Sequence, residues 1–391
     1  MGKCNLSWFK VLSWAAVLFL CGAGVHSWML DQKNTLRKIY PLSAPLSLIT
    51  MRCSDDAPDW MGEMIRRSVW EPRALSSQIA FIDKIGQLHY CNVGWSDGPF
   101  VSEPVSQETR FRYGSMTKPI TSASILLSAQ EGLFSLDTPL VKLLNIESGI
   151  GNSKLGRITV THLMTHQSGL KGKAFGKRES LWCPYNMSNI VNVRLSERAL
   201  EETNYSNLGY CVLGEVLSEA YQRGYRETVE QLFKLKDRGI LFAGHANEAD
   251  EVWHDYRYNS FYGESYLPRF DYEAVSATAG MTGSASAYAL LLKSILDKKL
   301  PGFLHWEPRE ISAICDIKKI RSCYGAAFYL FQSQNGRRFN VKEGYMPGSA
   351  GFVAVNEEAE IFVWLGNSDT LDAVKGEGMT AYLNLLGRAA F

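Results

Sequence analysis

Residues 111–121 read Phe111-Arg-Tyr-Gly-Ser-Met-Thr-Lys-Pro-Ile-Thr121, and this stretch decides how the rest of the chain is interpreted. It places Ser115 three residues before Lys118, and an apolar run with helical spacing follows as far as Gly132. Residues three apart on a helix share a face, so we expect the hydroxyl and the amine to meet at the helix start. A serine hydroxyl becomes a nucleophile when a base takes its proton. A lysine can be that base once burial or a nearby cation lowers its pKa.

The serine–lysine spacing alone has a plainer interpretation, a capping serine beside a solvated lysine, and it recurs at Ser7–Lys10 and Ser168–Lys171. A second motif, Tyr205-Ser-Asn207, stands where a polar loop runs into an apolar helix. We expect a lysine ammonium to lower the pKa of the Tyr205 phenol, which would let it shuttle protons. The amide of Asn207 can orient the lysine and hold a substrate.

Five segments resemble, in order and spacing, the serine β-lactamase and penicillin-binding-protein superfamily over most of residues 75–390: Phe111–Leu144, Thr161–Leu170, Asn204–Tyr210, Ala277–Ser286 and Gly344–Phe352. The resemblance is to the class C-like branch, which includes β-lactamases, D-aminopeptidases and esterases. It implies an α+β fold, an antiparallel sheet built from both termini and flanked by helices, with a mostly helical insertion. One hydrolase domain would span 28–391, with its sheet part at about 60–115 and 285–391 and its helical part at about 116–284.

The resemblance also implies an acyl-serine mechanism without metal or cofactor. Ser115 is then the nucleophile, Lys118 and Tyr205 share the acid and base work, and Asn207 holds the substrate. The backbone N–H groups of Ser115 and Gly348 would form the oxyanion hole.

The third motif departs from the family pattern of Lys-Thr-Gly or His-x-Gly. Tyr345-Met-Pro347 stands in its place, so Tyr345 replaces the cation that would meet a β-lactam carboxylate. The alternative is that another cation, Lys342, Arg337 or Arg338, meets the carboxylate while Tyr345 only packs on its strand.

Three functions remain open on this evidence. The first is an exported serine hydrolase acting on a small-molecule β-lactam, ester or peptide amide. The second is a penicillin-binding or D-aminopeptidase/esterase-type protein with slow β-lactam turnover, and the third is a non-catalytic binding module. The net charge of +1 in 391 residues gives no reason to expect nucleic acid as a partner.

The N-terminus predicts export. Lys3 and Lys10 precede the uncharged apolar stretch Val11–Val25, which is typical of a secretory signal over residues 1–27. The rival interpretation is an uncleaved anchor, which would be the only membrane attachment. Either one predicts a periplasmic or secreted protein, in the second case anchored to the inner membrane. Export permits disulfides among the six cysteines beyond the signal, with 15 pairings open and Cys315–Cys323 the easiest to close.

Several elements follow from periodicity and turn residues. Residues 77–93 predict a hairpin, 157–170 a helix, and 370–389 a last helix, whereas 31–60 read as an irregular lead-in. His162 and His166 stand four apart on the expected 157–170 helix, a spacing that can bind zinc. A catalytic zinc would need a third ligand, and no Glu follows His162 directly as in the metalloprotease motif, so a structural role is favoured for both.

Overall fold

The computed structural model describes residues 5–146, 154–245, 247–255, 257, 270–307, 315–368 and 377–389. Its centre is an antiparallel eight-stranded sheet in the order β1-β3-β2-β13-β12-β11-β10-β9. The strands are β1 (Arg52–Cys53), β2 (Ser77–Ile82), β3 (Leu88–Val93), β9 (Cys323–Tyr324), β10 (Tyr329–Gln332), β11 (Arg338–Met346), β12 (Ser349–Asn356) and β13 (Ile361–Gly366). Because β2 pairs with β13, strands from the two ends of the chain share one sheet, which confirms the predicted architecture.

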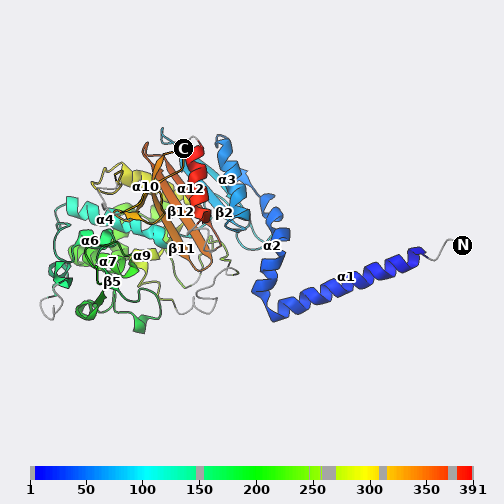
Figure 1. The fold of residues 1–391 in the computed structure, drawn as a ribbon, viewed down its shortest axis with the longest axis horizontal. Coiled ribbons are helices and arrows are strands. Elements are labelled where there is room, and N and C mark those ends of the chain that lie inside the picture. The colour runs from blue at the N-terminus through cyan, green and yellow to red at the C-terminus, as the bar shows by residue number, and fades with distance from the viewer. Residues whose placement is uncertain are drawn as a thin grey trace.

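Helices cover both faces of this sheet (Figure 1). One face packs against α3 (Asp59–Trp70) and α12 (Glu377–Arg388), and the other against α10 (Ala285–Leu296). Strand β13 shows that both faces of the sheet are buried. Phe362 and Trp364 lie in one core cluster, whereas Ile361, Val363 and Leu365 lie in the other. A strand that alternates between two buried faces must be apolar throughout, as this one is.

The helical part lies beyond α10. It contains α4 (Thr117–Gln130), α5 (Leu140–Leu143), α6 (Val160–Met164), α7 (Asn207–Tyr221), α8 (Tyr225–Phe233) and α9 (Ser276–Ala279). Small sheets join it, one of β4 (Phe111–Arg112), β8 (Met281–Gly283) and β7 (Leu241–Phe242), the other of β5 (Leu170–Lys171) and β6 (Arg194–Leu195). The predicted 157–170 helix was too long, because α6 ends at Met164 and His166 turns the chain with a left-handed φ of 60°.

The N-terminal region contradicts the expected irregular lead-in. Residues Asn5–Leu30 form helix α1, and Gln32–Leu48 form helix α2, which contains Pro41 and Pro45. Prolines usually end or kink a helix, but contacts with the rest of the protein stabilise α2 despite them. Tyr40 and Ala44 are buried, and the Tyr40 hydroxyl donates to the Val69 carbonyl of α3.

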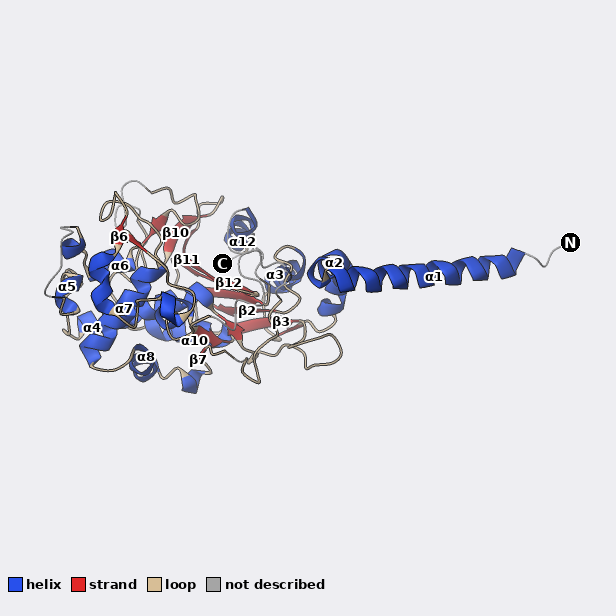
Figure 2. Ribbon diagram, turned by 90° about the horizontal axis from the view of Figure 1, so that it is seen from below, coloured by secondary structure: helices blue, strands red, loops and turns tan. Residues whose placement is uncertain are grey.

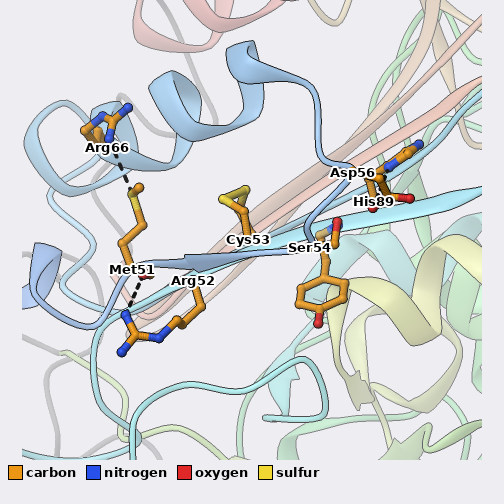
Figure 3. The surroundings of a disulfide bond; sticks show 9 residues. Met51, Arg52, Cys53, Ser54, Asp56, Arg66 and His89 are labelled. Carbon is orange, nitrogen blue, oxygen red and sulfur yellow. Dashed lines mark hydrogen bonds and ion pairs between the residues drawn. A yellow bond between two sulfur atoms is a disulfide. The ribbon is translucent and has the colours of Figure 1, made fainter.

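Three disulfides connect elements of the body. Cys53–Cys91 joins β1 to β3, Cys183–Cys211 ties a loop to α7, and Cys315–Cys323 closes the short loop anticipated from sequence. Around the first of these, the neighbouring residues Met51 and Arg52 continue into β1, with Arg66 of α3 against the Met51 sulfur (Figure 3). The short edge strand is therefore held covalently as well as by its backbone. The described part of the last helix is α12, and residues 370–376 of the predicted 370–389 helix lie outside the described residues.

Candidate active site

The predicted nucleophile lies on a tight turn against the sheet. Gly114–Met116 form a 3-10 turn, η1, that leads directly into α4. Gly114 has a φ of +54°, and a Cβ there would come within 2.5 Å of the Tyr345 backbone nitrogen. Only glycine fits this left-handed position and this close approach. The turn therefore presses Ser115 against β11.

Lys118 lies one turn further, fully buried beneath Ser115. Its Nζ is 3.0 Å from Ser115 Oγ, 2.7 Å from Asn207 Oδ1 and 2.8 Å from the Thr278 carbonyl oxygen. Burial and the positive charge of Lys342 lower the pKa of the Lys118 amine well below its usual range, and Glu343 opposes this. A neutral amine has two N–H donors and one lone pair. The amide oxygen and the carbonyl can only accept, so they take both donors. The lone pair is left for the Ser115 hydroxyl.

Tyr205 approaches Ser115 from the other side. Its hydroxyl lies 2.9 Å from Ser115 Oγ, and the following Ser206 caps α7, which begins at Asn207. The expected lowering of the phenol pKa is wrong in direction: burial and the Glu343 carboxylate raise the pKa of Tyr205. Burial favours a neutral Lys118, which then supplies none of the positive charge on which that expectation rested. Because 38% of Tyr205 remains exposed, water tempers this rise but does not reverse it.

His166 holds Tyr205 in place. Its Nδ1 accepts from the Ser206 backbone N–H at 3.2 Å, and its ring lies 4.4 Å from the ring of Tyr205. Burial and the lysines lower the pKa of His166 well below its usual range, which keeps the imidazole neutral. His162 instead caps its own helix through Thr159. Among the described residues no group of three His, Cys, Asp or Glu could hold a metal ion.

The hairpin of β11 and β12 shows which backbone N–H of β11 faces Ser115. Pro347 and Gly348 form its two-residue turn, so Met346 and Ser349 are the hydrogen-bonded pair and Tyr345 with Ala350 the next, non-bonded pair. The N–H of Tyr345 therefore points away from β12. It points to the side where Gly114 lies against the backbone nitrogen and oxygen of Tyr345.

This placement corrects the third motif. Gly348 sits in the turn with a φ of +74° and does not line the cavity beside Ser115. The glycine that the site requires is Gly344, where a Cβ would come within 1.8 Å of the Tyr113 carbonyl oxygen. The pattern Lys342-Glu343-Gly344 thus lies three residues before the expected Tyr345-Met-Pro347, and Tyr345 does not take the place of the cation.

Sequence reasoning missed a buried charge cluster at this strand. Lys342 Nζ lies 4.8 Å from the centroid of the Tyr205 ring and 3.5 Å from Glu343 Oε1, and Arg321 Nη2 lies 2.7 Å from the same oxygen. Burial lowers the pKa of Lys342 to about 8, although Glu343 opposes this, so the amine is largely charged near neutral pH. Lys342 was only one of three alternative cations, whereas a Lys-x-Gly pattern on a predicted strand could have singled it out.

A cavity of about 380 Å³ opens beside Ser115. Its walls are mainly apolar and aromatic, with two charged side chains: Ser115, Phe175, Thr203, Tyr205, Asn207, Phe270, Arg321, Tyr324, Glu343, Tyr345, Met346 and Pro347. Such a lining, with a few polar groups at one end, suits a small organic substrate. The predicted residues Ser115, Tyr205, Asn207 and Tyr345 all reach it, and Lys118 lies directly behind.

Known proteins resemble this chain along most of its length. A relative from Dichelobacter nodosus, named "Putative fimbrial assembly protein FimD, serogroup D", is 32% identical over 338 residues, 84% of each chain. A class C β-lactamase from Rhodobacter sphaeroides superposes with a TM-score of 0.62 at 16% identity, over 85% of this chain and 99% of that one. A D-amino acid amidase from Ochrobactrum anthropi SV3 gives 0.61 at 15% identity, over 84% and 97%. The family model described as "Beta-lactamase" matches residues 66–382, and the chain belongs to this β-lactamase family.

Proposed function

We propose that the protein is an exported serine acyl hydrolase that forms an acyl-enzyme on Ser115 and then hydrolyses it. Its substrate is a small amide, ester or β-lactam. The observation that carries this proposal is the set of hydrogen bonds made by Lys118. The neutral amine donates its two N–H groups to Asn207 Oδ1 and the Thr278 carbonyl oxygen, which leaves its lone pair to accept from the Ser115 hydroxyl.

The proposed reaction begins with transfer of the Ser115 proton to Lys118 while Ser115 Oγ attacks the substrate carbonyl carbon. The N–H groups of Ser115 and Tyr345 stabilise the oxyanion that forms. Tyr205, a protonated phenol, donates its proton to the leaving group as the carbonyl–leaving-group bond breaks, and the proton held by Lys118 then returns the Tyr205 phenolate to the phenol. Water then attacks the acyl-enzyme by the same proton transfers in reverse order.

The comparisons support this chemistry at a coarser level. The family and its amidase and β-lactamase relatives favour serine hydrolase chemistry. The positive charge of Lys342 beside Tyr205 would attract a substrate that carries a carboxylate, whereas the Glu343 carboxylate in the cavity wall would repel it. Both amides and esters therefore belong in the first substrate panel.

The direct test is Ser115→Ala. We expect loss of hydrolysis and of covalent labelling by a fluorophosphonate or a β-lactam, by at least ~10³-fold, with the fold retained. Ser124→Ala is the matched control, because Ser124 lies on α4, the helix that follows η1, and its hydroxyl donates to the Ile120 carbonyl. Labelling of Ser115→Ala at another serine would contradict the assignment.

A second candidate function follows from the name of the D. nodosus relative. A protein that assists assembly of a surface fibre could use the same serine to capture an acyl group without turning it over. Intact-mass spectrometry over time, with p-nitrophenyl esters, amino acid amides and β-lactams, separates three outcomes: turnover, a trapped acyl-enzyme and no acylation. A trapped adduct with every substrate class would favour this second candidate.

A further inference from the structure

Helix α2 presents an apolar stripe that the body does not cover. Tyr40, Ala44 and Ser47 face the body and are buried. The opposite side, continued by the capping residue Ile49, exposes four large apolar side chains: Ile39 (41%), Leu42 (77%), Leu46 (37%) and Ile49 (61%). Spacings of three and four residues place them on one face of the helix. We call these four residues the α2 stripe.

Helix α1 directly precedes this stripe and has the properties of a membrane span. Residues Lys10–Leu30 form 21 residues with a mean hydropathy of 1.5, and none of the most apolar window is buried. Trp8 and Trp28, both exposed, stand about 30 Å apart along the helix at 1.5 Å per residue, which is the thickness of the hydrocarbon core. Indole rings favour the two membrane–water interfaces.

The junction between the helices fixes their relative direction. Asp31 caps α2 by accepting from Asn34 N–H, and Ser27 Oγ lies 2.8 Å from Thr35 Oγ1 across the bend. Two perpendicular views agree that α2 runs across the axis of α1, between α1 and the body (Figures 1 and 2). A bilayer crossed by α1 would therefore lie parallel to α2, with the stripe facing it.

The body is bound to α2 rather than tethered by a flexible linker. Arg37 Nε donates to the Arg257 carbonyl, and Arg257 lies over the Tyr40 ring at 5.5 Å. Helix α2 also contains no acidic residue, and its exposed Lys38 adjoins Ile39 of the stripe, which favours anionic lipid head groups. Any membrane that holds α1 thus brings the stripe to its surface.

We propose that α1 is retained as an anchor and that α2 is an interfacial helix, whose stripe lies in an anionic lipid bilayer and seats the hydrolase domain on the membrane. The same sequence has a second interpretation, a signal removed near residue 27. In that case the stripe would face water.

The test uses the full chain in vesicles of phosphatidylcholine and phosphatidylglycerol. Cys21, the free cysteine in the described residues, and Cys4 are both replaced by serine, so that the dye reacts at the introduced cysteine. Leu42→Cys and, separately, Ile49→Cys then carry an environment-sensitive NBD dye. Leu133→Cys, at the end of α4 and 45% exposed, is the matched control. Retained fluorophosphonate labelling verifies the fold of each labelled protein.

We expect lipids brominated on their acyl chains to quench the dye at 42 and 49 several-fold more than at 133, and aqueous iodide to do the reverse. Equal iodide quenching at all three positions would overturn the proposal. The mass of the protein isolated from cell membranes gives an independent check. A mature chain that begins near residue 28 would overturn the retained anchor, even if the stripe still binds vesicles.

Discussion

Lys118 and Tyr205 contact the same oxygen of Ser115, but their surroundings favour different protonation states. Burial beside Lys342 favours a neutral amine on Lys118, whereas burial beside Glu343 favours a protonated phenol on Tyr205. The pKa of the lysine is lowered and the pKa of the tyrosine is raised. When neighbouring groups have their pKa values shifted apart in this way, the group with the lower pKa is suited to act as the base and the group with the higher pKa as the acid. These surroundings support the proposed roles, with Lys118 as the base for acylation and Tyr205 as the acid for the leaving group.

This division of roles predicts how Tyr205→Phe depends on the leaving group. An alkyl amine must be protonated as it leaves, so we expect kcat/KM for amino acid alkylamides to fall ~10²–10⁴-fold. A p-nitrophenolate leaves without a proton, so the loss for p-nitrophenyl esters should be much smaller. Steady-state kinetics on both series, with Tyr185→Phe as a control outside the serine contacts, checks this. Equal losses for both leaving groups would assign the acid to another residue.

The charge on Lys342 predicts a pH effect. Lys118 accepts a proton only when neutral, so acylation rises with pH through the pKa of Lys118. Lys342→Met removes the positive charge that helps to lower this pKa, so the pKa rises and the acid limb should move to higher pH. The pH dependence of p-nitrophenyl ester cleavage measures this shift. Lys319→Met, a 77% exposed lysine with the same charge change, should leave the limb in place. A limb that moves to lower pH in Lys342→Met would refute the proposed electrostatics.

At the scale of elements, the proposed mechanism takes its second oxyanion donor from the edge of β11. Tyr345→Pro removes that N–H without removing a ladder bond to β12, because Tyr345 belongs to a non-bonded pair. We expect kcat to fall ~10²–10³-fold, the usual cost of one oxyanion donor. Tyr345→Phe keeps the N–H and should stay close to wild type. If both variants lose the same activity, the side chain rather than the backbone matters.

Elements with clear periodicity could be predicted from the sequence, and elements held by tertiary contacts could not. The hairpin at 77–93 and the helix after Ser115 follow from alternation and helical spacing. Helix α2 was missed because its two prolines disfavour a helix. Packing of the helix against α3 stabilises it despite them, and a local sequence pattern does not reveal such packing.

In the candidate site, too, some residues could be predicted from the sequence and others could not. Ser115, Lys118, Tyr205 and Asn207 could be found by motif and come together as expected. The third motif was placed three residues late, because the need for Gly344 arises from contact with Tyr113, a residue more than 200 positions away. The roles of Arg321 and His166 likewise depend on loops that meet only in the folded chain.

At the scale of the whole molecule, the sheet separates two cores, so stability and catalysis can be perturbed separately. Trp364 of β13 is 1% exposed and packs in the cluster on the α3 and α12 side, away from Ser115. We expect Trp364→Ala to lower the free energy of unfolding by ~3–5 kcal/mol. The rate of fluorophosphonate labelling should stay near wild type at temperatures where the variant is folded. Chemical denaturation measures the first quantity, with the 57% exposed Trp253→Ala as control. Labelling that slows markedly in the folded variant would mean that the two cores are not separate, and unchanged stability would contradict the burial argument for Trp364.

The pairing of β2 with β13 has a consequence for how this chain is made. The partners Ile82 and Ile361 are roughly 280 residues apart, and such non-local pairing is slow because the intervening chain must close first. During synthesis the N-terminal hairpin is complete long before its neighbour in the sheet exists, so one edge of that hairpin waits unpaired. A chain whose sheet stays open until the last strand is made leaves this edge exposed throughout synthesis, and it needs protection from aggregation until β13 pairs with it.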